Sequence, residues 1–77
     1  MAEQEQHPTI CHAVFRTLPV KQQAALLWTT GKLLAHRWEG HQAVGLYQLG
    51  EFYCELSYDT TTYALLRTRT FTNLENH

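Results

Sequence analysis

The stretch VKQQAALLWTTGKLLAHRW at residues 20–38 contains the point where the chain changes from a helical to a strand pattern. Before this point, apolar residues recur at the spacing i, i+4, i+7 and i+8 of one helix face: Val20, Ala24, Leu27 and Trp28. The polar residues 21–23 are expected to keep the other side of the helix in water. The pattern predicts a helix over residues 20–30, with Gly31 capping it in the left-handed conformation.

After Gly31, β-branched and aromatic residues become frequent, and turn signals recur about every eight to twelve residues. This spacing is typical of a β-meander, with strands predicted at residues 32–38, 43–49, 52–58 and 63–72. Before the main helix, residues 8–15 are predicted to form a short helix, which Pro19 separates from the next one. The predicted fold is therefore α+β: an N-terminal helix, or two short helices, packed on a four-stranded antiparallel β-meander.

The length of 77 residues fits one domain. Residues 1–7 are expected to be a flexible, polar lead-in, and residues 8–77 to form the single small α+β domain. The formal net charge of −1 argues against nucleic acid and acidic membranes as partners, because both attract a basic surplus. The longest apolar run, residues 24–28, is far shorter than the roughly 20 residues that span a membrane. We expect a cytoplasmic protein.

Alternation along the predicted strands assigns their side chains to two faces. In the third strand, one set is expected to pack against the helix: Phe52, Cys54, Leu56 and Tyr58. The other face then carries Tyr53, Glu55 and Ser57. In the fourth strand, the same alternation groups Leu65, Arg67, Arg69 and Phe71. Because the helix covers only one face of the sheet, the other face is expected to expose aromatic and charged side chains together.

The residue types that carry catalysis or bind metals are present without the spacing that such sites need. Cys11 and His12 are adjacent, and neighbouring side chains on a helix point about 100° apart. His36 and His41 flank a predicted turn, but two histidines alone make a weak metal site. Cys54 is in the core-facing register, where a free cysteine behaves as a small hydrophobe. We therefore expect no catalytic residue, no metal and no cofactor, and a protein that is not an enzyme.

Charged and aromatic residues on the strands are the candidate interaction surface. Arg37, Glu55, Arg67 and Arg69 lie on different strands and are expected to form a cross-strand charge ladder. The alternative is an anion or peptide site that combines Arg67 and Arg69 with the aromatic rings of Tyr47 and Tyr53. Trp38, just before a predicted turn, is expected to be partly exposed. The full candidate surface is Arg37, Trp38, Tyr47, Tyr53, Glu55, Arg67 and Arg69.

The order of several short motifs resembles a group of short, uncharacterised bacterial proteins. The motifs are LPVKQQAALLW at residues 18–28, Gly31, Arg37, LYQL at residues 46–49, and FYCEL followed by Tyr58. Members of the group look like a helix ending in glycine followed by strands, and they often carry valine where this chain has Cys54. The resemblance implies an αβ-meander and a packing role for Cys54, and it supplies no activity.

These observations favour a non-enzymatic interaction module that associates with itself as a homodimer, or with another protein, through the open sheet face or an edge strand. A light surface charge and more aromatic residues than one helix can cover are typical of such a surface. A charged residue at Tyr47 or Tyr53 is then expected to release monomers. The alternative function is a small-ligand or peptide-binding domain with Arg37, Arg67 and Arg69 as anion contacts.

Overall fold

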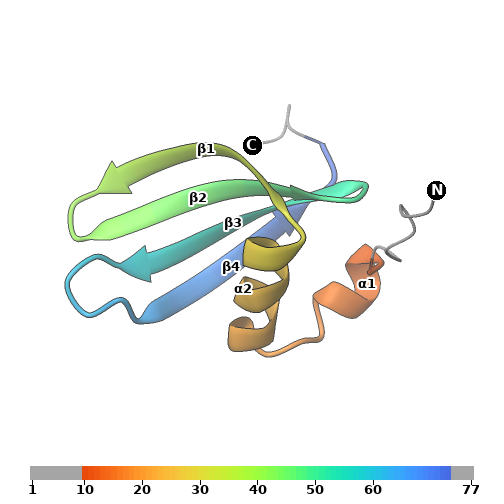
Figure 1. The fold of residues 1–77 in the computed structure, drawn as a ribbon, viewed down its shortest axis with the longest axis horizontal. Coiled ribbons are helices and arrows are strands. Elements are labelled where there is room, and N and C mark those ends of the chain that lie inside the picture. The colour runs from red at the N-terminus through yellow and green to blue at the C-terminus, as the bar shows by residue number, and fades with distance from the viewer. Residues whose placement is uncertain (1–9, 74–77) are drawn as a thin grey trace.

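The computed structural model describes residues 10–73, in which two short helices precede four strands (Figure 1). The elements are α1 (His12–Phe15), α2 (Val20–Thr29), β1 (Lys32–Glu39), β2 (Gln42–Leu49), β3 (Phe52–Asp59) and β4 (Leu65–Phe71). The main helix and all four strands therefore lie where the sequence predicts them. The short helix begins later than predicted, at His12, and residues 8–9 of that prediction lie outside the described residues, as does the lead-in predicted at 1–7.

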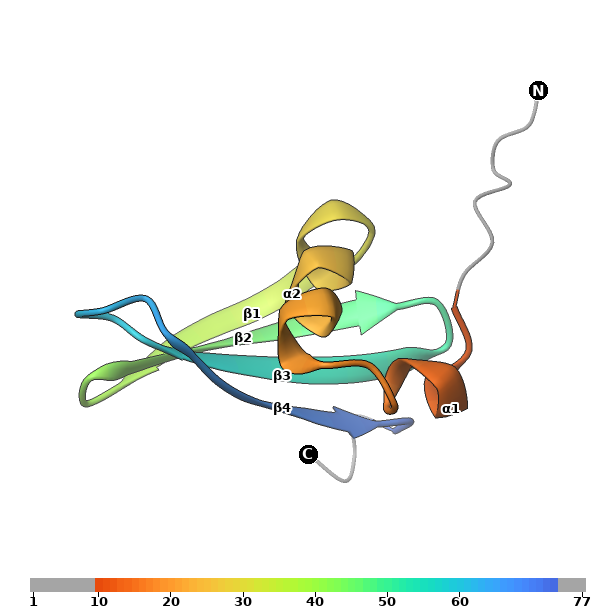
Figure 2. The same cartoon turned by 90° about the horizontal axis from the view of Figure 1, so that it is seen from below.

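The four strands form one antiparallel sheet in the order β1-β2-β3-β4, so the predicted meander is confirmed. Two tight turns join its first three strands, and each contains a glycine with positive φ: Gly40 at 63° and Gly50 at 64°. Glycine adopts this left-handed conformation without the steric cost that a Cβ atom brings. Helix α2 lies on one face of the sheet (Figure 2), and Phe15 of α1 is buried in the same core as Leu27 of α2, which gives a two-layer α+β fold.

Helix α2 covers only part of that face because it runs across the strands (Figures 1 and 2). A helix with its side chains is about 10 Å across, whereas a strand of eight residues such as β2 is about 27 Å long. The end of the sheet that carries the β1–β2 and β3–β4 turns therefore extends beyond the helix (Figure 1). The side chains on the helix side of this end have no helix above them among residues 10–73.

The hydrophobic core lies under the two helices. Its fully buried members come from both helices and the two central strands: Phe15, Ala24, Leu27, Leu49, Phe52, Cys54 and Leu56. The predicted orientation of Phe52, Cys54 and Leu56 toward the helix is therefore confirmed. Trp28, which the periodicity places on the same stripe, is 58 % exposed because the helix ends near the margin of the core.

Gln23 is buried, although its position among polar residues predicts exposure. Only 5 % of its surface is accessible. Its amide nitrogen donates to the backbone oxygen of Phe15 at 2.8 Å, and its amide oxygen accepts a hydrogen bond from the Thr68 hydroxyl at 2.5 Å. One side chain thus links the end of α1, helix α2 and strand β4. Burial of this amide is tolerated because both ends of it are hydrogen-bonded.

A β-bulge changes the face on which Leu65 lies. The register between β3 and β4 shifts so that Tyr58 pairs with Leu65 while Ser57 pairs with Arg67, which leaves Leu66 as the extra residue. Leu65 is therefore on the helix side, packed against the core, and Arg67 is on the opposite face. Simple alternation, which groups Leu65 with Arg67, is wrong at this point because it does not include the extra residue.

Gly31 ends α2, but not in the left-handed conformation that the sequence predicts. The glycines with positive φ in the described chain are Gly40 and Gly50. Glycine is required at position 31 for steric reasons, because a Cβ atom there would lie 2.7 Å from the carbonyl oxygen of Leu27. The amide of Gly31 meanwhile donates to the carbonyl oxygens of Leu26 and Leu27 at 3.2 and 3.0 Å. The chain thus turns directly from the last helical turn into β1.

Gly31→Ala is expected to lower the free energy of unfolding by about 2 kcal/mol, because the helix end must move to admit the methyl group. Urea unfolding followed by circular dichroism measures the change. Gly40→Asn is the matched control, since nothing lies within 4 Å of a Cβ atom there and asparagine tolerates positive φ. Equal stability of Gly31→Ala and the unchanged chain would contradict the close approach.

Candidate functional site

Three of the hollows on the described structure are candidate sites, and they differ in what lines them. The end hollow, of about 390 Å³, lies beside α1 and the β2–β3 turn. The aromatic hollow, of about 400 Å³, lies on the helix side of the sheet beyond α2. The arginine hollow, of about 260 Å³, lies on the face opposite the helices. Each contains residues that the sequence singles out, so each is a candidate site.

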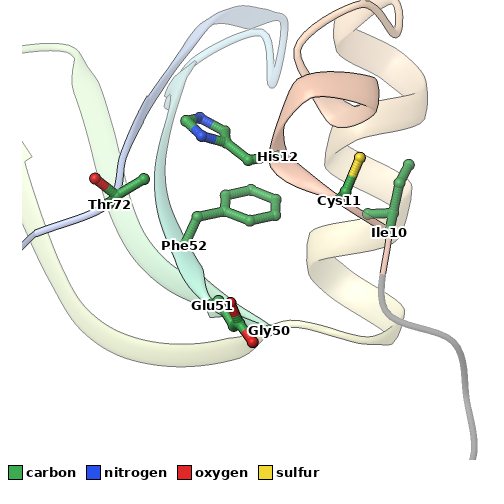
Figure 3. Close-up of a pocket in the computed structure, with 7 residues that line it drawn as sticks. All are labelled: Ile10, Cys11, His12, Gly50, Glu51, Phe52 and Thr72. Carbon is green, nitrogen blue, oxygen red and sulfur yellow. The ribbon is translucent and has the colours of Figure 1, made fainter.

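The end hollow contains Cys11 and His12, but the two side chains do not form a catalytic pair (Figure 3). The imidazole of His12 stacks on the ring of Phe52 with centroids 4.8 Å apart, and its Nε2 lies 2.8 Å from the hydroxyl oxygen of Thr70. Figure 3 shows the Cys11 thiol pointing away from this ring. His12 therefore holds α1 against the sheet.

Cys54 is the other candidate nucleophile, and its surroundings keep it inert. The residue is fully buried, and removal from water raises the pKa of its thiol from 9.0 to about 12. A thiol with this pKa is almost entirely protonated at neutral pH, whereas the thiolate is the reactive form. Cys54 therefore acts as a small apolar side chain under α2.

Two further features are absent from residues 10–73. No group of three or more histidine, cysteine, aspartate or glutamate residues in this range could hold a metal ion. Within the same range, no helix has the length and apolar character needed to cross a membrane.

The aromatic hollow gathers exposed and half-buried apolar side chains from α2, from the strands and from the β3–β4 turn. They include Trp28, Leu33, Tyr47, Tyr58, Tyr63 and Leu65. Gly45 belongs to its lining, where a Cβ atom would lie only 2.9 Å from Cε1 of Tyr47. Trp28 is 58 % exposed, Leu33 52 % and Tyr63 75 %. Exposed apolar residues grouped in this way, rather than scattered singly, mark an interaction surface.

Trp38 adjoins the aromatic hollow through His36. Their rings meet edge to face with centroids 4.3 Å apart, and His36 lines the hollow. Trp38 is 65 % exposed, which confirms the expectation from its place before the β1–β2 turn. The exposed apolar surface thus continues from the hollow onto strand β1, at the edge of the sheet.

Tyr63 enters the aromatic hollow from a strained backbone position. Its φ of 61° is uncommon for a bulky residue and costs about 1–3 kcal/mol. The turn holds it there, because Asp59 Oδ1 accepts hydrogen bonds from the amides of Thr61 and Thr62 at 2.8 and 2.9 Å, which also lowers the pKa of Asp59. The amide of Tyr63 donates to the backbone oxygen of Asp59 at 2.7 Å. These hydrogen bonds hold the large ring of Tyr63 at the surface in spite of the strain.

The arginine hollow is built by strand register. Across the sheet, Arg37 pairs with Val44, Val44 with Ser57, and Ser57 with Arg67. In the next row Leu46 pairs with Glu55 and Glu55 with Arg69. Directly paired residues share a face, so both rows point away from the helices. The lining residues are Arg37, Glu39, Gln42, Val44, Glu55, Ser57, Arg67 and Arg69.

Glu55 organises the charges in this hollow. It is 7 % exposed, and its two carboxylate oxygens lie 3.3 Å from Arg37 Nη1 and 3.8 Å from Arg69 Nε. Arg37 also donates from Nε to Glu39, and these two carboxylates raise the pKa of its guanidinium. The predicted charge ladder is therefore confirmed for Arg37, Glu55 and Arg69. Arg67 forms no ion pair with the described residues.

The candidate surface predicted from sequence is divided between the two faces of the sheet. Five of its members lie opposite the helices: Arg37, Tyr53, Glu55, Arg67 and Arg69. Trp38 and Tyr47 lie on the helix side, in register with Ala43 and Cys54. Sequence reasoning missed Trp28 and Tyr63 as exposed members of the aromatic hollow. The length of α2 relative to the strands is the signal that could have indicated an uncovered end of the sheet.

Comparison of this chain with protein-family models, with curated proteins and with solved structures found no match. The resemblance to short bacterial proteins stays a prediction. Function is therefore inferred below from the surfaces alone.

Proposed function

We propose that this chain is a non-enzymatic interaction module whose partner is a second copy of itself, paired through the outer edge of β1. The observation that carries the proposal is the exposure of β1 at the edge of the sheet. All eight of its residues are exposed, and it forms one edge of the sheet. Within residues 10–73 no segment pairs with its outer side. An exposed edge strand is a template for pairing with another chain.

The side chains of β1 complement one another when two copies pair antiparallel. The strand contains its own bulge, which makes Leu34 the extra residue. If Leu34 is left out on both copies, a pairing centred on His36 places Leu33 opposite the partner's Trp38. Both of these side chains are more than half exposed in the single chain and lie on the helix side. The two-fold axis repeats this contact, so the dimer would contain two Leu33–Trp38 pairs, one on each side of the axis.

Charges along β1 support the same arrangement. The centred pairing places Lys32 opposite the partner's Glu39, on the face away from the helices. Opposite charges across a strand pair stabilise it, whereas like charges destabilise it. At the other edge strand, β4, a pairing centred on Thr68 would place Arg67 opposite the partner's Arg69. Self-pairing is therefore favoured at β1 over β4.

A single strand pair with two apolar contacts buries less area than a standard protein interface, so we expect a dimer of micromolar affinity. Light scattering after size exclusion, over roughly 1 µM to 1 mM protein, should show the mass rising from 8.9 kDa toward twice that value. A mass that stays at one chain over this whole range would refute self-association.

Trp38→Glu is expected to weaken the dimer by about 30-fold or more, since truncating a central aromatic contact typically costs about 2 kcal/mol or more. Val14→Glu is the matched control, because Val14 is a 49 % exposed apolar residue on α1, away from β1. Equal weakening by the two variants would mean that net charge, and not the β1 edge, controls association.

Charge exchange tests the register. Lys32→Glu alone is expected to weaken the dimer about threefold or more, because it places two glutamates opposite each other at each end of the strand pair. The double variant Lys32→Glu/Glu39→Lys restores opposite charges and should recover the affinity, as measured by sedimentation velocity. Failure of the second substitution to rescue the first would exclude this register.

A further inference from the structure

We propose that the arginine hollow, on the face opposite the helices, is a binding site for a carboxylate group, held by the hydroxyl of Ser57 and the guanidinium of Arg67. This inference concerns a different surface from the β1 edge and does not depend on self-association. Three features carry it: a buried hydroxyl that has no hydrogen-bond partner within residues 10–73, an arginine that has no ion pair within the same residues, and the net charge of the hollow.

Ser57 is the first feature. It lies in the floor of the hollow with 6 % of its surface accessible, yet its hydroxyl makes no hydrogen bond with any residue in the range 10–73. Buried polar groups are hydrogen-bonded in the great majority of cases, and leaving one unsatisfied costs about 1–3 kcal/mol. A site that keeps a hydroxyl in this state is suited to a ligand that accepts a hydrogen bond from it.

Arg67 is the second feature. It is directly paired with Ser57 across β3 and β4, so its side chain projects from the same row over the same hollow. Arg37 and Arg69 are engaged by Glu55, whereas Arg67 has no acidic partner among the described residues. Its planar, forked guanidinium matches the two oxygens of a carboxylate, which binds arginine in a bidentate manner.

The balance of charge selects a monoanion. The lining contains three arginines and two glutamates, which gives a formal charge of +1. One carboxylate neutralises this surplus, whereas a phosphate dianion would leave excess negative charge beside Glu39 and Glu55. Val44, 4 % exposed, also lies in the floor and offers an apolar contact to the carbon next to the carboxylate. A small carboxylate with a short aliphatic group is therefore the expected ligand class.

Nuclear magnetic resonance titrations test this site on the full chain. Sodium acetate, sodium propionate, sodium phosphate and sodium chloride are each added at constant ionic strength, and the Arg67 Nε–Hε and Ser57 amide signals are followed. Acetate and propionate should give saturable shifts at these two residues, and chloride should not. Tighter binding of phosphate than of acetate would overturn the carboxylate assignment, and equal shifts with chloride and with acetate would overturn the site.

Variants separate the two contacts from general charge effects. Ser57→Ala and Arg67→Gln should each weaken acetate binding about tenfold or more, the size expected for one hydrogen bond to a charged group. Arg16→Gln removes the same charge from an exposed position after α1 and should leave the affinity unchanged. Equal losses in Arg16→Gln and Arg67→Gln would refute a specific role for Arg67, whether or not Ser57→Ala folds.

Discussion

Gln23→Leu is expected to lower the free energy of unfolding by roughly 2–4 kcal/mol, which is a large fraction of the stability of a domain this small. Leucine fills a similar volume but can neither donate to the backbone oxygen of Phe15 nor accept from the Thr68 hydroxyl. Both groups would lose their partner, and with them the polar link between α1, α2 and β4. Urea unfolding at neutral pH, followed by tryptophan fluorescence, measures the loss.

Gln22→Leu is the matched control for this experiment. Gln22 precedes Gln23 on the same helix but is exposed, so its replacement should change the stability by less than about 0.5 kcal/mol. Thr68→Val removes the hydroxyl that donates to the Gln23 amide oxygen. The double variant Gln23→Leu/Thr68→Val should therefore lose less free energy of unfolding than the sum of the losses in the two single variants. Additive losses, or equal effects of Gln22→Leu and Gln23→Leu, would mean that these hydrogen bonds do not stabilise the fold.

A second large effect is expected at high pH, where the buried Cys54 thiol makes the fold sensitive to deprotonation. The pKa of this thiol is about 12 in the folded chain, against 9.0 for an ordinary cysteine. The unfolded chain therefore loses its proton first as the pH rises. Stability from the neutral thiol is complete below pH 9 and is lost between pH 9 and 12 at about 1.4 kcal/mol per pH unit.

Cys54→Val isolates this contribution, because valine fills a similar space and does not titrate. At pH 7 we expect the free energies of unfolding of the two proteins to differ by less than about 1.5 kcal/mol. By pH 11 the free energy of unfolding of the unchanged chain should have fallen by about 3 kcal/mol relative to that of the variant. All other residues are the same in the two proteins, so their contributions cancel in the difference. Cys11→Ser, which replaces an exposed thiol instead of the buried one, is the matched control variant. Parallel stability curves for Cys54→Val and the unchanged chain would contradict the burial effect.

Local patterns predicted much of the fold. Period-two alternation over residues 52–58 assigned Phe52, Cys54 and Leu56 to the core face, and burial of all three confirms it. The helical spacing that starts at Val20 located α2 to within one residue. These predictions succeed because each depends on residues that are close in sequence, where backbone geometry alone sets the side-chain direction.

The exceptions have causes that local patterns do not contain. Leu65 changes face because a bulge adds one residue to β4, and the bulge is defined by pairing with β3. Gln23 is buried because two partners from distant segments satisfy its amide. Gly31 is needed for its lack of a side chain, since the last turn of α2 leaves no room for one.

The candidate sites likewise combine features that local sequence predicts with features that depend on contacts between distant segments. The alternation of β3 placed Glu55 and Ser57 on one face, and the charge ladder from Arg37 to Arg69 could be expected from the strands alone. Trp38 directly follows Arg37, so alternation alone places the two side chains on opposite faces. The assignment of Tyr47 to the helix side required the pairing of β2 with β3. The aromatic hollow required, in addition, the angle at which α2 crosses the sheet, because that angle decides which end of the helix side remains uncovered (Figure 1).

Local sequence patterns were sufficient to predict the α+β class, the succession of two helices and four strands, and the core-facing set of β3, because propensity and periodicity act over a few neighbouring residues. Only the tertiary structure decided that Ser57 lies buried between Arg37 and Arg67, and that Trp28 and Tyr63 share one surface. Those relations join residues that are far apart in the chain. They depend on strand register, on two bulges and on helix placement, which are set by the packing of the whole domain.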